Sequence, residues 1–177
     1  VIARDGVAVI VNKASVPADD ISLKDLIRIY SGEVTNWKSL GGPDAEIVVF
    51  NRDEASGTRS CFGDATVKTA GKKFTNSAAI VTSNGDMVAK VSSTPYAIGY
   101  CGFGYLGRDS GTKSVMVGGV EPEVMNVNNG SYPVMRDLIL ITRGTVPSGS
   151  FEEAFINFIL SDEGQDIVAE ENFIPLK

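Results

Sequence analysis

The sequence predicts an α/β fold in which helices flank a mixed sheet. Short apolar stretches, rich in β-branched residues, alternate along the chain with stretches of helical periodicity. The length of 177 residues is enough for one domain, or for one domain and a piece of another. A hydrophobic content of 43% and a charged content of 21% are typical of a globular protein.

The first half of the chain contains the clearest elements. Gly6–Asn12 is a nearly continuous apolar run, which predicts a strand buried on both faces. A helix is expected to open at Ser22, with the spacing of a capping box, and to stop at Gly32. The only tryptophan, Trp37, is expected to close a small core, and a second strand is expected at Ile47–Phe50.

The second half continues the alternation of strands and helices. Four further strands are expected, at residues 78–81, 97–100, 114–117 and 138–142, the last of them long and buried. Three further helices are expected, at residues 87–91 behind a polar cap, at 151–160, and from 162 to about 169. The glycine- and asparagine-containing segment 118–130 is expected to be a loop.

Composition excludes several functions. A net charge of −6 argues against non-specific nucleic-acid binding, which needs a basic face. No apolar run approaches the roughly 20 residues of a membrane span. The first twelve residues lack the basic region and cleavage pattern of a signal peptide, and they resemble the start of a strand cut from a longer chain.

The chain lacks the residues of the commonest metal and catalytic sites. It contains no histidine, which removes the commonest general base and metal ligand. Two cysteines, Cys61 and Cys101, are too few for a zinc site of the usual kind, so no metal or cofactor is expected. The two cysteines could form a disulfide in an oxidising compartment, but small buried thiols are the simpler interpretation.

The stretch from Ile47 to Val67 predicts an anion site. A strand runs into a turn at Ser56, Gly57 and Thr58, where a helix begins, and helix starts present free backbone N–H groups and a positive dipole end. Arg52 could add a guanidinium, with Glu54 holding it by an ion pair. Ser and Thr are also ordinary helix caps, and Gly is ordinary in loops, so this motif alone is a weak signal.

A set of landmark segments runs over essentially the whole chain: residues 5–12, 26–37, Arg52, 56–59, 97–100, 129–133 and 160–165. Their order resembles that of the periplasmic-type phosphate-binding proteins of ABC importers, which have the type II solute-binding fold. Each segment is modest by itself, and the specificity comes from their combination.

The resemblance implies a three-layer α/β lobe that binds phosphate by direct hydrogen bonds without a metal. Residues 1–135 would be the second ligand-binding lobe, and residues 136–177 a crossover strand and C-terminal helices that in the family return to the first lobe. Arg52, Ser56, Gly57 and Thr58 match the ligand-contacting motif, and Glu54 stands in the place of the acidic residue that orients the arginine.

One departure from the family pattern limits this inference. The first-lobe segment, which commonly supplies a carboxylate that accepts a proton from phosphate, is absent, and none of Asp5, Asp19 and Asp20 matches its motif. The apolar face of the helices at 151–169 then lacks its family partner. We therefore expect this chain alone to bind phosphate weakly, and a complementary first-lobe chain to restore binding.

The resemblance favours the extracytoplasmic solute-binding component of an ABC importer, with a membrane permease as partner. A sensor or adhesion module on the same fold, or a binder of molybdate, tungstate or sulfate, remains an alternative. An enzyme acting on phosphate esters is disfavoured, because the sequence has no histidine, no P-loop and no carboxylates at metal-binding spacing.

Overall fold

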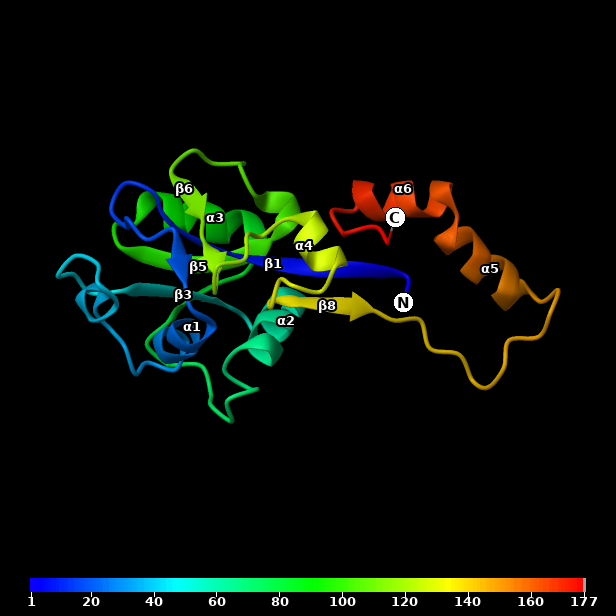
Figure 1. Cartoon of the computed structure of the whole chain (residues 1–177), viewed down its shortest axis with the longest axis horizontal. Coiled ribbons are helices and arrows are strands. Elements are labelled where there is room, and N and C mark those ends of the chain that lie inside the picture. Colours follow the sequence, from blue (N-terminus) through cyan, green and yellow to red (C-terminus); the bar gives the residue numbers. More distant parts are fainter. Residues whose placement is uncertain (177) are drawn as a thin grey trace.

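A computed structural model describes residues 1–176, and it contains alternating strands and helices (Figure 1). In chain order the elements are β1 (Ala3–Asn12), β2 (Asp20–Ile21), α1 (Leu23–Tyr30), the 3₁₀ turn η1 (Trp37–Leu40), β3 (Val48–Arg52), α2 (Gly57–Ala65), β4 (Ala79–Val81), α3 (Asn84–Ser93), β5 (Ala97–Gly102), the 3₁₀ turn η2 (Phe103–Tyr105), β6 (Thr112–Ser114), β7 (Met116–Val117), α4 (Val124–Asn128), β8 (Met135–Leu138), α5 (Phe151–Leu160) and α6 (Asp162–Glu170).

The main sheet is mixed, as predicted. Its strand order is β4-β3-β5-β1-β6, and β8 also pairs with β1. The β3 strand is parallel to β4 and β5, whereas β1 is antiparallel to β5, β6 and β8. A separate small sheet pairs β2 with β7. The long first strand therefore pairs with three other strands, more than any other strand of the sheet does.

Helices cover both faces of the sheet, so the lobe has three layers. Val7, Val9 and Val11 of β1 belong to a core that also contains residues of α1 and α2, whereas Ile10 belongs to a second core with residues of α3. This alternation follows from the two-residue period of a strand. Figure 1 shows α3 on one side of the sheet and α1 and α2 on the other. Trp37 is buried in the first core, which confirms its predicted structural role.

Serine caps define where the longer helices begin. In each case the serine hydroxyl accepts a hydrogen bond from the backbone N–H three residues later, and the serines are Ser22, Ser56, Ser83, Ser150 and Ser161. Gly32 follows the end of α1 with φ = 82°, the left-handed conformation that glycine adopts without strain. The predicted helix boundaries at Ser22 and Gly32 are confirmed.

Two predictions between residues 112 and 130 need correction. The single strand expected at 114–117 is two short strands, because β6 pairs with β1 and β7 pairs with β2. The chain changes sheets at Val115, whose side chain is buried between them. The segment expected to be a loop contains the short helix α4, whose inward-facing Val127 is also buried.

The prediction of a long buried strand at 138–142 is wrong. The β8 strand ends at Leu138, opposite Ala3, and β1 begins at Ala3, so later residues have no strand to pair with. Ile139 is 64% exposed and Ile141 is 88% exposed. Leu140, between them, is 37% exposed and shares a cavity with Phe151 and Phe155 of α5, so this apolar run is only partly covered by described residues.

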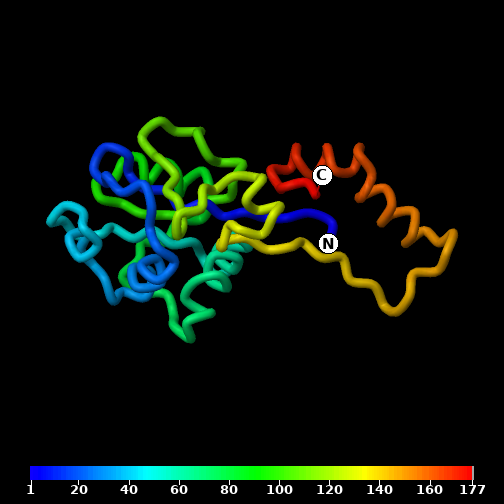
Figure 2. The backbone as a smooth tube through the Cα atoms, viewed as in Figure 1, coloured from blue at the N-terminus to red at the C-terminus, as the bar shows by residue number. Residues whose placement is uncertain are grey.

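The C-terminal segment forms an arm that extends from the end of the sheet (Figure 2). Hydrogen bonds attach the arm to the sheet mainly near the C-terminal end of the arm. The side chain of Gln165 donates to the carbonyl of Ile2 and accepts from the N–H of Leu176, and Ile174 exchanges two backbone hydrogen bonds with Arg4. The outer helix α5 has no buried residue, and Phe151 is 81% exposed.

Cys61 and Cys101 are free and buried, which confirms that they are thiols and not a disulfide. Cys61 lies in the core that contains α1 and α2, and Cys101 lies in the core that contains α3. Burial raises the pKa of both thiols to about 12, because a thiolate loses its hydration there.

Candidate anion-binding site

A cavity of about 280 Å³ brings the predicted site residues together. Arg52, Ser56, Gly57 and Thr58 all line it. The remaining lining residues come from five other parts of the chain: Asp5, Asn84, Gly102, Gly104, Tyr105, Arg136, Glu171, Asn172 and Phe173. The cavity thus lies where the end of β3, the starts of α2 and α3, the glycine-rich corner after β5 and the C-terminal segment meet.

Arg52 is the buried cation of this cavity. It is the last residue of β3 and only 8% exposed. Its Nη1 donates to Oδ1 of Asn84 at 3.0 Å, and its Nη2 donates to the carbonyl oxygen of Thr82 at 3.0 Å. Its Nε is buried without a hydrogen-bond partner among the described residues. Buried donors are normally satisfied, so this one is a candidate for a ligand.

The start of α2 supplies the neutral donors. The Ser56 hydroxyl oxygen accepts a hydrogen bond from the N–H of Arg59 at 3.2 Å, which leaves its own hydrogen available for another acceptor. The N–H groups of Gly57 and Thr58 belong to the first helical turn, where no intrahelical acceptor exists. Together with the helix dipole, these groups create a locally positive site on an acidic chain.

The expected ion pair between Glu54 and Arg52 does not form. Glu54 is directed into solvent with a side chain 94% exposed, and its Oε1 lies 3.8 Å from Nη1 of Arg59. Asp53 is the carboxylate nearer to Arg52, with 3.9 Å between its Oδ2 and the arginine Nε. The hydrogen bonds that orient Arg52 come from Asn84 and a backbone carbonyl, so the orienting role assigned to Glu54 has no support in the structure.

The structure adds three charged residues that the sequence analysis did not identify as part of the site, Asp5, Arg136 and Glu171. Nε and Nη2 of Arg136 both donate to Oδ2 of Asp5, at 3.2 and 3.0 Å. Burial raises the pKa of the Asp5 carboxyl, and the Arg136 guanidinium partly offsets that rise. Asp5 and Arg136 are opposite each other in the register of β1 and β8, a long-range pairing with no local sequence signal. Asn84 belongs to the polar cap that the sequence predicts before the helix at residues 87–91, and it is the first residue of α3.

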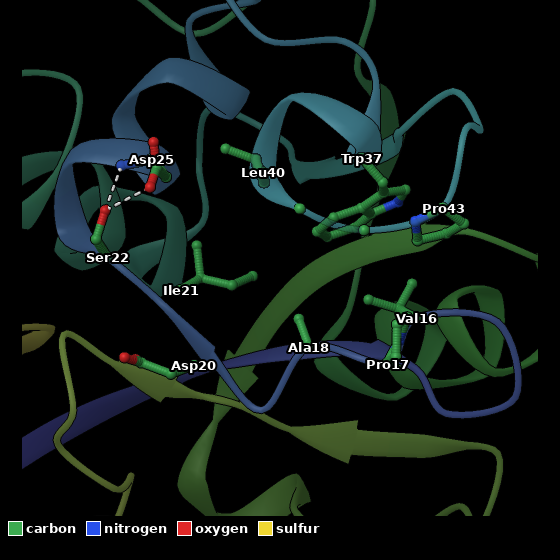
Figure 3. A pocket seen from close by; sticks show the side chains of 12 residues that line it. Val16, Pro17, Ala18, Asp20, Ile21, Ser22, Asp25, Trp37, Leu40 and Pro43 are labelled. Carbon is green, nitrogen blue, oxygen red and sulfur yellow. Dashed lines mark hydrogen bonds between the residues drawn. The ribbon is translucent and has the colours of Figure 1, made fainter.

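A larger cavity, of about 380 Å³, lies between the β1–β2 loop, the start of α1 and the η1 turn (Figure 3). It is poorly suited to an anion. Its charged lining residues, Asp20 and Asp25, are both acidic. The Ser22 hydroxyl is bonded to Asp25, and the indole N–H of Trp37 donates to the carbonyl of Tyr96. The polar groups here are satisfied within the fold.

The described residues contain no group of three or more His, Cys, Asp or Glu placed to hold a metal ion. None of the helices in the part of the chain that the structure describes is long and apolar enough to cross a membrane. The groups in the Arg52 cavity that suit an anion are the guanidinium groups of Arg52 and Arg136 and the residues of the α2 start, Ser56, Gly57 and Thr58.

Residues 1–163 match the family described as the PBP superfamily domain. The chain is 34% identical to the phosphate-binding protein PstS of Borreliella burgdorferi over 96% of its length and 36% identical to PstS of Bacillus subtilis over 96%. It spans 63% of the first relative and 56% of the second.

A solved structure agrees with this likeness. The crystal structure of a putative phosphate ABC transporter substrate-binding protein from Clostridium perfringens, with bound phosphate, is 41% identical and superposes with a TM-score of 0.79. The match covers 99% of this chain and 70% of that one.

Proposed function

Because the chain belongs to the PBP superfamily, we propose that its cavity at Arg52 and the start of α2 binds inorganic phosphate. The observation that carries the proposal is the buried Arg52 guanidinium, fixed by Asn84 and Thr82 with one donor unused, beside a capped helix start. The PstS relatives and the phosphate-bound Clostridium protein support phosphate as the anion.

The binding chemistry consists of direct hydrogen bonds. Arg52 supplies charge-assisted donors, Ser56 and Thr58 supply hydroxyls, and the backbone of Gly57 and Thr58 supplies N–H groups. Gly57 is exposed, which leaves room for a ligand at the backbone. Because Gly57 is exposed to solvent, water competes for the donors here, and we expect a dissociation constant of the order of 1 mM, about −4 kcal/mol, for this chain alone.

In this proposal the chain works as part of the extracytoplasmic solute-binding component of an ABC importer. Residues 1–135 are the second lobe, and residues 136–177 lead to a first lobe that closes over the anion. The exposed apolar side chains of the arm support a protein partner of this kind, and they include Ile139, Ile141, Phe151, Phe155 and Phe158. A membrane permease is the further partner.

Binding of another oxyanion, and a sensor or adhesion role, are the alternative functions on the same fold. Sulfate, molybdate and tungstate offer similar oxyanion geometry, and a sensor or adhesion module uses the same lobe without a permease. Catalysis on phosphate esters receives less support, because the relatives are named as binding proteins and the described residues hold no metal cluster.

The test is titration of phosphate into the 177-residue chain at constant ionic strength, followed by NMR chemical shifts. Arg52→Ala is the site variant, and Arg143→Ala, an exposed arginine outside the cavity, is the matched control. We expect saturable shifts at the α2 start that Arg52→Ala removes and Arg143→Ala preserves. Equal shifts with sulfate contradict phosphate selectivity, and no saturable shift with any oxyanion contradicts the proposal.

A further inference from the structure

Two consecutive ion pairs link β1 to β8, and they lie on opposite faces of the sheet. In the antiparallel register, Asp5 is opposite Arg136 and Arg4 is opposite Asp137. Both pairs form, with 3.0 Å between Nη2 of Arg136 and Oδ2 of Asp5, and 3.2 Å between Nε of Arg4 and Oδ1 of Asp137. Neighbouring residues of a strand point to opposite faces. Only the first pair lines the anion cavity.

The Arg136 guanidinium lies against the start of α2. A Cβ atom added to Gly57 would be 3.1 Å from Nη2 of Arg136, so the guanidinium occupies the space beside the first helical residue. A cation at the positive end of a helix dipole is electrostatically unfavourable by itself. Asp5 holds Arg136 there with one carboxylate oxygen, which receives both of the hydrogen bonds that the side chain makes to described residues.

We propose that Arg136 is a second ligand-contacting guanidinium of this site and that Asp5 is the residue that positions Arg136. This inference rests on the proposed phosphate function. The Arg136 side chain is 38% exposed, and its Nη1 makes no hydrogen bond to a described residue. An oxyanion at the Gly57 and Thr58 N–H groups then lies between two guanidinium groups, Arg52 from β3 and Arg136 from β8.

A simpler role for Arg136 would be to neutralise Asp5. An unpaired carboxylate beside the cavity would repel phosphate, so loss of Arg136 alone weakens binding under either role. The double variant separates the two roles. If Arg136 only neutralises Asp5, removal of both charges restores the wild-type affinity. If Arg136 contacts the anion, removal of both leaves binding weak.

The experiment titrates inorganic phosphate into five proteins at constant ionic strength, and reads the affinity from NMR shifts of the α2 start. They are the wild-type chain, Arg52→Ala, Arg136→Gln, the double variant Asp5→Asn/Arg136→Gln, and Arg4→Gln/Asp137→Asn. The last is the matched control, because it removes the equivalent pair from the same strands on the other face. Circular dichroism establishes that each variant is folded.

We expect Arg136→Gln and its double variant to bind phosphate at least tenfold more weakly than the wild type, and the control pair to bind within twofold. Wild-type affinity in the double variant overturns the proposal, as does equal weakening in the control pair. Binding that is lost in Arg52→Ala but unchanged in Arg136→Gln overturns this inference alone. Absence of binding in the wild-type chain overturns the phosphate function and this inference together.

Discussion

Ser56 caps α2, and in the proposed function it also offers a hydroxyl to the anion, two tasks that substitution can separate. The cap is a hydrogen bond of 3.2 Å from the N–H of Arg59 to the serine Oγ. Loss of a serine cap costs about 1 kcal/mol, and in a chain of this size about 1 kcal/mol lowers the melting temperature by roughly 2–4 °C. Ser56→Ala should show this loss, whereas Ser56→Asn and Ser56→Asp keep a capping oxygen and should melt close to the wild type.

Phosphate affinity should follow a different order. In Ser56→Asp the introduced carboxylate would lie beside the proposed anion position, and two unit charges 4 Å apart repel by about 1 kcal/mol in water and by about 4 kcal/mol near a protein surface. Since about 1.4 kcal/mol is a factor of ten, binding should weaken by between about fivefold and several hundredfold. Ser56→Asn keeps the charge neutral and offers an amide donor, so its affinity should stay within a few-fold of the wild type.

The assay pairs thermal melting by circular dichroism with phosphate titration by NMR. Ser22→Ala is the control, because Ser22 caps α1 in the same way, with 3.0 Å between its Oγ and the N–H of Asp25, and lines a different cavity. It should lose stability like Ser56→Ala without a change in affinity. Wild-type phosphate affinity in Ser56→Asp would refute the placement of the anion at this helix start.

Three further predictions concern the buried thiols, the attachment of α6 to the sheet and the pH dependence of stability. Cys61 and Cys101, whose pKa burial raises to about 12, should resist iodoacetamide at pH 8 in the folded chain and react fully in denaturant, as mass spectrometry will show. Gln165→Ala removes hydrogen bonds to Ile2, Ile159 and Leu176, so hydrogen exchange in α6 should speed up while that in β1 stays slow. The raised pKa of Asp5 means that the folded chain binds more protons than the unfolded chain just above pH 3.8. The contribution of this group to the free energy of unfolding therefore falls as the pH rises. The unfolding free energy of the wild type, measured relative to that of Asp5→Asn, should fall over the same pH range.

Local sequence patterns predicted the helices and strands well where nearby residues determine where the element begins and ends. The apolar run at Gly6–Asn12 and the serine caps at Ser22 and Ser56 encode their structure within a few residues, and each appears as expected. The run at 138–142 carries an equally apolar pattern, yet only Leu138 is in a strand, because a strand also needs a neighbour with which to pair.

The site likewise contains residues that a local motif predicts and residues that only the strand register brings together. Arg52 and residues 56–58 are close in sequence, so one motif was enough to place them together. Asp5 and Arg136 meet only through the register of β1 with β8, which a single sequence does not reveal. Glu54 was misjudged because nearness in sequence was taken for contact, whereas the turn before α2 directs its side chain into solvent.

The three strand pairings of β1 have a consequence for how the chain folds. Each strand that pairs with β1 lies in the second half of the chain: Val11 is opposite Ile98, Asn12 opposite Thr112, and Ala3 opposite Leu138. Sheets built from such distant contacts fold on the order of milliseconds to seconds, because long loops must close first. During synthesis β1 has no partner strand until residues 97–138 emerge, so we expect the pairing of these strands to be slower than helix formation.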